Sequence, residues 1–192
     1  MAGREYAIFD TVIGRCGIAW GRSGIVAVQL PEAREIDTRR RMLRQYSDAR
    51  EVRPSINAAI AIEAITALLR GLPCDFSDVA LDMYDMPPFN QRVYEFARTI
   101  PRGETWTYAA FAKRLGASGA GHAVGQAIGR NPFAILVPCH RVLAVEGGAD
   151  GFSMNGGVVS KRRLLSLEGA LTKSGPTLFD ALLSVAPSRP HS

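Results

Sequence analysis

The first 30 residues alternate short apolar runs with glycines. Apolar and β-branched residues dominate Tyr6–Phe9, Cys16–Trp20 and Ile25–Leu30. Runs of this length, bounded by turn residues, are typical of β-strands. Glycine punctuates them at positions 14, 17, 21 and 24, so we predict short strands joined by turns.

A helical period follows. Residues 34–50 are rich in Arg and place Met42, Leu43 and Tyr46 at helical spacing. Ser55 is a candidate cap for a stronger helix that ends near Gly71. Its predicted apolar face consists of Ile56, Ile60, Ile65, Leu68 and Leu69. Strands followed by helices predict a small α+β domain over residues 1–85.

Two prolines within Asp85–Asn90 mark a junction, because proline stops both helix and sheet. The pattern beyond it predicts helices over Phe89–Ile100, over Tyr108–Leu115 with Thr107 as cap, and from Ser118 or Gly119 to about Ile128. The last two are short and are joined by a turn that contains Gly116. Such a pair is a helix-turn-helix pattern.

The second half ends with four further features. The apolar run Phe133–Val137 predicts a buried strand, and a Cys-His turn follows it. A glycine-rich loop over residues 147–157 and a final helix over Ser160–Glu168 come next. We therefore expect an N-terminal supporting domain over 1–85, a mostly helical domain over 86–170, and a tail over 171–192 that is poorly ordered beyond about Val185.

Composition narrows the class of protein. The chain has 192 residues and 47% hydrophobic content, enough for one full core or two small ones. No run of 18 uncharged apolar residues occurs, and the first residues lack an apolar signal-peptide core. We therefore expect no membrane span and a cytoplasmic location.

The three cysteines, Cys16, Cys74 and Cys139, are too few and too scattered for a disulfide framework. No Cys-x-x-Cys pair and no histidine cluster indicates a zinc site. We expect neither a metal nor another cofactor. Cys16 and Cys74 are most simply small buried hydrophobic residues.

Charge is distributed unevenly between the two halves. Residues 1–85 hold eleven basic and twelve acidic side chains, a net charge of −1. Residues 86–170 hold ten basic and five acidic side chains, a net charge of +5. A positive second half suits a polyanion partner such as nucleic acid, although a basic protein without that role has the same composition.

The stretch Val137–Leu143 carries the candidate chemistry. It places the Cys139 thiol beside the His140 imidazole within an apolar frame. A buried thiol is normally inert, but a neighbouring His can take its proton and leave a nucleophilic thiolate. The pair alone fits a core cysteine with a chance neighbour better than a nucleophile. Pro138 before it, Arg141 after it and Asn131-Pro132 upstream make a nucleophile the better interpretation.

Pro-Cys-His-Arg-Val with these flanks resembles the signature of the O6-alkylguanine-DNA alkyltransferases, also called methylated-DNA–protein-cysteine methyltransferases. The resemblance covers about residues 86–170 well and the earlier part loosely. It implies an α+β protein with a small ribonuclease-H-like N-terminal domain and a helix-turn-helix domain that carries the Cys turn. It also implies irreversible, single-turnover transfer of an alkyl group from O6 of guanine, and possibly O4 of thymine, in double-stranded DNA to Cys139, by a monomer.

The same resemblance assigns roles around the nucleophile. His140 is the base, acting through a water because adjacent side chains on an extended turn point apart. Glu168 orients and charge-stabilises the imidazole. Asn131 joins the helix-turn-helix to the Cys turn, and the Tyr108 hydroxyl donates to the leaving guanine.

A base must leave the helical stack before a thiol can reach O6. Family members fill the gap with an Arg from the recognition helix, where this chain has His122. An imidazole is shorter and mostly neutral at pH 7, so it offers less charge and reach. Small neighbours let that helix approach the minor groove closely: Ala120, Gly121, Ala123 and Gly125.

The base pocket is expected to involve the glycine-rich loop, with Phe152, Ser153, Met154 and Asn155 as candidates that the sequence does not distinguish. Lys161 matches a family lysine that ties this loop down or offers charge near the thiolate. Arg141 is expected to be structural, its fork bonding carbonyls or a carboxylate.

Three other functions fit parts of the pattern. A non-catalytic protein that binds alkyl lesions is the main alternative, because the finger Arg is missing. A helix-turn-helix transcription factor is a second alternative, because the family includes sensor proteins that regulate genes. Those proteins carry an extra cysteine-rich zinc domain, which this chain does not have. A cysteine hydrolase has no separate oxyanion-loop motif in its favour.

Overall fold

A four-stranded sheet forms the first half of the molecule. The computed structural model describes residues 3–144 and 161–170. The sheet has the order β3-β2-β1-β4, with β1 at Glu5–Thr11, β2 at Gly14–Gly21, β3 at Gly24–Gln29 and β4 at Arg50–Glu51. The first three strands are antiparallel, as two-residue turns require, whereas β4 runs parallel to β1 after a helical crossover. The sequence predicts the first three strands but not the two-residue β4.

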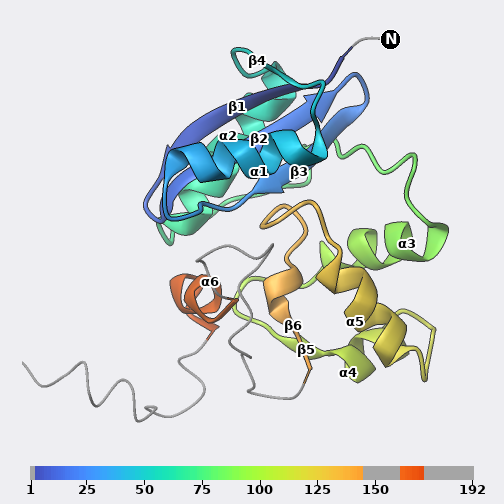
Figure 1. Cartoon of the computed structure of the whole chain (residues 1–192). Coiled ribbons are helices and arrows are strands. Elements are labelled where there is room, and N and C mark those ends of the chain that lie inside the picture. The colour runs from blue at the N-terminus through green and yellow to red at the C-terminus, as the bar shows by residue number, and fades with distance from the viewer. Residues whose placement is uncertain (1–2, 145–160, 171–192) are drawn as a thin grey trace, which may run out of the picture.

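Two helices cover opposite faces of this sheet (Figure 1). Helix α1 (Glu35–Gln45) packs Met42 against Tyr6, Ala19 and Ala27. Helix α2 (Ile56–Leu69) packs on the other face, and its N-cap Ser55 accepts a hydrogen bond from the amide of Ala58, as predicted.

The predicted apolar face of α2 is partly wrong. Ile56 is 84% exposed and Ile60 is 39% exposed. The helix instead buries Ala58, Ala61 and Ala64 along with Ile65, Leu68 and Leu69. Small side chains bring the helix close to the sheet, so packing selects the alanine stripe over the larger isoleucines.

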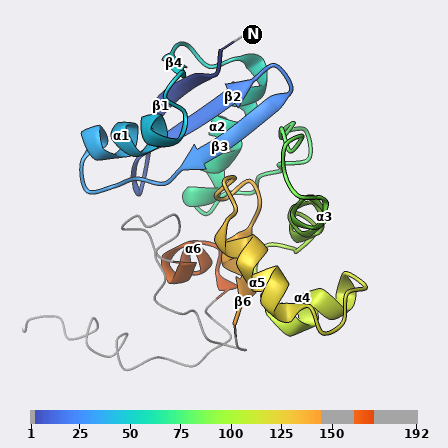
Figure 2. The ribbon, with the colours of Figure 1, turned by 45° about the vertical axis from the view of Figure 1, so that its right-hand side comes forward.

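The second half is helical, and Figures 1 and 2 both show it at the opposite end of the molecule from the sheet. Its helices are α3 at Pro88–Ala97, α4 at Tyr108–Arg114, α5 at Gly121–Gly129 and α6 at Lys161–Leu167. Thr107 caps α4 as predicted, accepting a hydrogen bond from the amide of Ala110. Gly116 and Gly119 have positive φ and make the turn to α5.

The run Phe133–Val137 is buried as predicted, but it is not a strand. It makes only isolated bridges, Val28 with Phe133 and Ala134 with Val137, and folds back on itself. Ile135 has φ +71°, which is strained for a β-branched residue. The side chain of Asn131 bonds the backbone at both ends of this turn, so local polar contacts outweigh the β preference of the side chains.

A two-stranded parallel ladder brings distant segments together at the base of the second half. Trp106 of β5 (Trp106–Thr107) pairs with Val142 of β6 (Val142–Leu143). Tyr108 directly follows β5, and Arg141 directly precedes β6. The ladder therefore places the start of α4 beside the Cys-His segment, a contact that two-residue strands do not announce in sequence.

The main apolar core runs through both halves. One cluster of buried residues includes Ile18 and Val28 of the sheet together with Phe133, Val137 and Cys139. The amide of Val28 also donates to the carbonyl of Pro132 at 2.8 Å. The boundary expected near residue 85 thus lies over a shared core, and the division into 1–85 and 86–170 stays a prediction. Within 3–144 and 161–170, no helix is long and apolar enough to cross a membrane.

Candidate active site

Cys139 lies at the start of a short 3-10 helix, η1 (Cys139–Arg141). The sequence predicts an extended turn here, but the amide of Arg141 bonds back to the carbonyl of Pro138, and that of Cys139 to Val137. Pro138 precedes η1 with its fixed φ of −77° and supplies no competing amide donor. Only 4% of Cys139 is exposed, so the thiol lies at the edge of the core.

His140 is fully buried, and its two ring nitrogens have different environments. Nε2 lies 2.7 Å from Oε1 of Glu168. An ionised carboxylate only accepts hydrogen bonds, so Nε2 carries the proton of the neutral ring. Nδ1 has no hydrogen-bond partner among the described residues. The neutral ring therefore has a free lone pair on Nδ1, which is what a general base needs.

Arg141 holds the same carboxylate. Its Nε and Nη2 donate to the two oxygens of Glu168 at 2.9 and 2.7 Å, and its Nη1 donates to the carbonyl of Ile100 at 2.7 Å. The side chain thus bonds both a carboxylate and a carbonyl, as expected. Burial would raise the pKa of Glu168, but the bonds from His140 and Arg141 outweigh it and lower that pKa to about 2.

Burial keeps the resting nucleophile and base neutral. It raises the pKa of the Cys139 thiol, against hydrogen bonding by Asn131 and the charge of Lys161. Burial also lowers the pKa of His140, against the bond and charge of Glu168. Thiol and imidazole are therefore both uncharged near pH 7, and a proton must move during the attack itself.

Asn131 connects the end of α5 to the Cys turn. Its Nδ2 donates to the carbonyl of Val137 at 3.1 Å, and its Oδ1 accepts from the amide of Phe133 at 2.9 Å. Its own amide bonds the carbonyl of Ile128 near the end of α5. This is the connection that the resemblance implies.

Tyr108 begins α4 and is wedged between two neighbours. A Cβ added to Gly125 of α5 would lie 3.0 Å from the Tyr108 ring, tighter than most such contacts, so the ring would have to shift. On another side, Nζ of Lys161 lies 5.9 Å from the ring centroid. Nζ also donates to the carbonyl of Val142 at 3.1 Å, so Lys161 joins α6 to the strand that follows the Cys-His segment.

The exposed side of α5 is almost bare of large side chains. His122 and Gln126 project from it, with the Gln126 amide nitrogen 3.2 Å from Nε2 of His122. Gly121, Ala123 and Gly125 are only partly exposed, and Ala120 directly precedes the helix. A Cβ at Gly121 or Gly125 would point toward α4, at Ala109 and the Tyr108 ring, so these two glycines also allow α4 and α5 to pack closely. That this set faces a groove stays a prediction.

The sequence also predicts a base pocket that involves the glycine-rich loop. Its four candidate residues fall outside the described residues: Phe152, Ser153, Met154 and Asn155. Among the described residues, no group of three or more His, Cys, Asp or Glu side chains is arranged to hold a metal ion.

The sequence did not single out Tyr94. Its buried hydroxyl donates to the carbonyl of Ala127 at 2.9 Å, and burial raises its pKa to about 12. It looks like any core residue of α3, so no sequence signal marks it.

Comparison with known proteins points to one family. Residues 88–170 match the family model described as 6-O-methylguanine DNA methyltransferase, DNA binding domain. A Mycobacterium tuberculosis methylated-DNA–protein-cysteine methyltransferase is 44% identical over 120 residues, which cover 62% of this chain and 70% of the relative. A DNA base-flipping protein of Thermus thermophilus is 40% identical over 121 residues, covering 62% and 80%.

The fold has a similar match among solved structures. The crystal structure of Mycobacterium tuberculosis OGT in complex with DNA superposes with a TM-score of 0.69 at 33% identity, over 87% of this chain and 94% of that one. The match extends beyond the helical half into the sheet.

Proposed function

The chain belongs to the methylated-DNA–protein-cysteine methyltransferase family, and we propose that it repairs DNA by moving an alkyl group from O6 of guanine to Cys139. The observation that carries the proposal is the Nε2–Oε1 contact of 2.7 Å between His140 and Glu168, directly beside Cys139. Because of that contact, Nδ1 of His140 is free to accept a proton. The residues involved lie within the segment that matches the family model.

The proposed step is a direct displacement. The Cys139 sulfur forms a bond to the alkyl carbon as the carbon–O6 bond breaks, and the electron pair of that bond stays on the guanine oxygen. The thiol proton passes to Nδ1 of His140 through a water, and the imidazolium then gives up a proton to balance the one that the guanine gains. Overall, the thiol proton replaces the alkyl group on the guanine. The product is a thioether that ordinary thiol exchange does not reverse, so one molecule removes one alkyl group.

Glu168 stabilises the imidazolium that forms in this step. Its low pKa keeps it ionised throughout, and Arg141 fixes its orientation. The Tyr108 hydroxyl is proposed to donate to O6 or N3 of the leaving guanine. Lys161 adds charge that favours the thiolate, and Asn131 holds the turn.

The DNA is proposed to lie against α4 and α5. The thin surface of Ala120, Gly121, Ala123 and Gly125 allows close approach to a minor groove, and His122 takes the position that fills the gap of the everted base. The charge of +5 on residues 86–170 attracts the backbone.

Several finer points belong to the same proposal. The lesion is O6-alkylguanine in double-stranded DNA, the protein acts as a monomer, and residues 1–85 form a supporting domain of ribonuclease-H-like type. The strand order 3-2-1-4 with a parallel β4 supports that type. Three free cysteines suit a reducing cytoplasm.

Intact-protein mass spectrometry tests the reaction. After incubation with a duplex that holds one O6-methylguanine, we expect the wild type to gain the mass of one methylene unit, located by peptide mapping at Cys139. Cys139→Ser gains no mass but still binds the duplex, because hydroxyl attack is far weaker while the DNA face is unchanged. An unmodified wild type would exclude the transferase.

A non-catalytic lesion-binding protein is the second candidate. The relative named a DNA base-flipping protein and the imidazole at position 122 favour it. It predicts tight binding to the lesion duplex by the wild type with no added mass, which the same experiment detects.

A further inference from the structure

Two arginines connect the loop after α3 with the end of α6. One donates to this loop, and the other donates from it. Arg141 donates from η1 to the carbonyl of Ile100 and holds Glu168 with its other nitrogens. Arg102, two residues beyond Ile100, donates from Nη2 to the carbonyl of Leu167 at 3.4 Å. Leu167 is the last residue of α6 and directly precedes Glu168. Segment 100–102 is therefore bonded to Arg141, which holds the Glu168 carboxylate, and to the last residue of α6, which precedes Glu168.

The same guanidinium reaches the first half of the chain. Nη1 of Arg102 donates to the carbonyl of Leu72 at 2.8 Å, and Nη2 donates to that of Gly71 at 2.9 Å. These carbonyls lie just after α2, where Gly71 turns the chain with φ +76°. A cation is favoured at the C-terminal ends of two helices at once, since their unpaired carbonyls carry partial negative charge.

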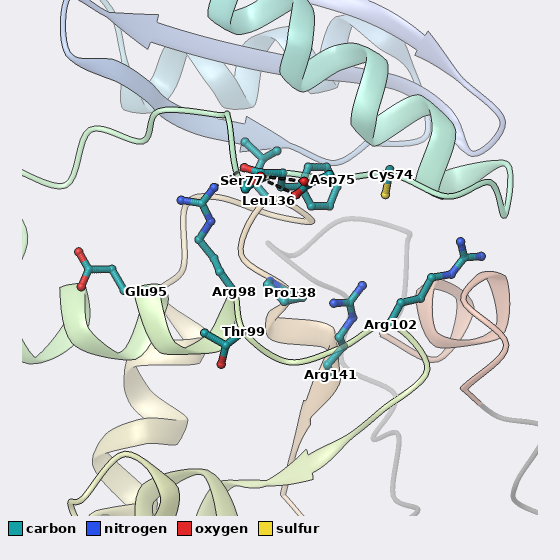
Figure 3. A pocket seen from close by; sticks show the side chains of 11 residues that line it. Cys74, Asp75, Ser77, Glu95, Arg98, Thr99, Arg102, Leu136, Pro138 and Arg141 are labelled. Atoms are coloured by element: carbon teal, nitrogen blue, oxygen red, sulfur yellow. Dashed lines mark hydrogen bonds between the residues drawn. The ribbon is translucent and has the colours of Figure 1, made fainter.

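A pocket of about 410 Å³ is lined by Arg98, Arg102 and Arg141, and also by Pro138. Figure 3 shows these side chains, with Arg98 reaching the segment that carries Ser77. Arg98 resembles Arg102 in chemistry: its Nη2 donates to the carbonyls of Phe76 and Val79. These hydrogen bonds of Arg98 lie away from α6, which makes Arg98 a matched control.

We propose that Arg102 is a positioning residue that sets the distance between Glu168 and His140 by holding the end of α6. The effect of Arg102 on alkyl transfer rests on the proposed function, whereas its effect on the position of Glu168 does not. Helix α6 has only seven residues and buries Leu164 and Leu165. Lys161 anchors the start of this helix to the carbonyl of Val142, and Arg102 bonds its last residue, Leu167. Glu168 follows Leu167 directly, so a shift of the helix end moves its carboxylate.

The charged groups that act most on the pKa of His140 are Glu168, Arg141 and Lys161. The main effect that we propose for removal of Arg102 is therefore a change in the position of Glu168. Moving Glu168 away removes the partner that raises the pKa of His140, and that pKa falls further. Simple loss of a nearby positive charge would raise it instead, so the sign separates the two effects.

NMR titration of the His140 ring provides the direct test. In Arg102→Ala we expect the pKa of His140 to fall relative to wild type, and in Arg98→Ala to stay unchanged. In Arg102→Lys the pKa of His140 should lie between those of the wild type and Arg102→Ala. An ammonium can still bond the end of α6, but it lacks the forked donors of a guanidinium. An unchanged or raised value in folded Arg102→Ala overturns the proposal.

Transfer kinetics give the functional consequence. The single-turnover rate constant of Arg102→Ala at pH 7.5 should fall roughly tenfold, because the base is weaker and misplaced. The acid limb of its pH profile moves to lower pH with the His140 pKa, which loss of stability alone does not produce. Arg98→Ala keeps the wild-type profile.

The outcomes are distinguishable from failure of the proposed function. If the wild type transfers no alkyl group, the NMR titration still decides whether Arg102 positions Glu168. If the wild type transfers normally and both arginine variants share its pH profile, Arg102 has no positioning role.

Discussion

At the scale of single residues, the carboxylate of Glu168 determines the state of its neighbours. It is buried and accepts hydrogen bonds from His140 and Arg141. These bonds keep it ionised, which fixes the proton of His140 on Nε2 and frees Nδ1. A base with its lone pair fixed in one direction loses little free energy to reorientation during proton transfer.

Glu168 also predicts how stability depends on pH. Its pKa is about 2 in the folded protein and ordinarily 4.5. The unfolded chain binds a proton more readily between these values, so the stabilisation is complete above about pH 4.5 and is lost as pH falls toward 2. Chemical denaturation between pH 7 and pH 2.5 should show this loss in the wild type.

Glu168→Gln should remove that part of the pH dependence and lower stability at pH 7 by about 3 kcal/mol, since Arg141 keeps a buried charge without its partner. Asp75→Asn is the control, because that carboxyl also has a lowered pKa but is exposed. Equal pH dependence in wild type and Glu168→Gln would contradict the assignment of Glu168 as an ionised partner.

At the scale of elements, contact between α4 and α5 positions Tyr108. The ring rests where Gly125 has no side chain, and a Cβ there would lie 3.0 and 3.1 Å from two ring carbons. The ladder of β5 and β6 fixes the residue before Tyr108 against the segment after Arg141. The orientation of the hydroxyl is thus set by one missing methyl group and two strand pairs.

Gly125→Ala should displace the Tyr108 ring and slow alkyl transfer about tenfold, because the donor to the leaving guanine is misplaced. Gly129→Ala is a matched control on the same helix, where an added Cβ meets nothing within 4 Å. It should keep the wild-type rate and gain up to about 1 kcal/mol of stability from helix propensity. Single-turnover rates and thermal denaturation measure both. Equal rates in the two variants would contradict the role of Gly125.

Local signals predicted most elements of this fold, and tertiary contacts decided the others. Thr107 and Ser55 cap their helices as expected, because a cap depends on residues three positions apart. The run Phe133–Val137 has a strand composition, yet Asn131 folds it into a turn. The Glu168–His140 bond spans 28 residues, so only the family resemblance anticipated it, and nothing in the sequence marked Arg102.

At the scale of the whole molecule, the two halves share one apolar core. Val28 of the sheet bridges to Phe133, which is fully buried in the same cluster as Cys139. Arg102 adds polar links from the end of α2 to α6. Separate folding of the halves would expose this common surface, so we expect the sheet and the helical half to unfold together.

The two tryptophans allow this to be measured. Trp20 lies in β2 of the sheet and Trp106 lies in β5 of the helical half. Fluorescence of Trp20→Phe then follows the helical half, and that of Trp106→Phe follows the sheet. We expect each variant's fluorescence transition in urea to coincide with its own circular dichroism transition.

Phe133→Ala tests whether the shared core causes this coupling. The truncation should lower the free energy of unfolding by about 3–5 kcal/mol. Both fluorescence transitions should move together, since Phe133 contacts the core of both halves. Ile56→Ala is the control, because that side chain is 84% exposed and its removal should leave both midpoints in place. A shift of the Trp106 signal alone would mean that the sheet is stable by itself and that the halves are energetically independent.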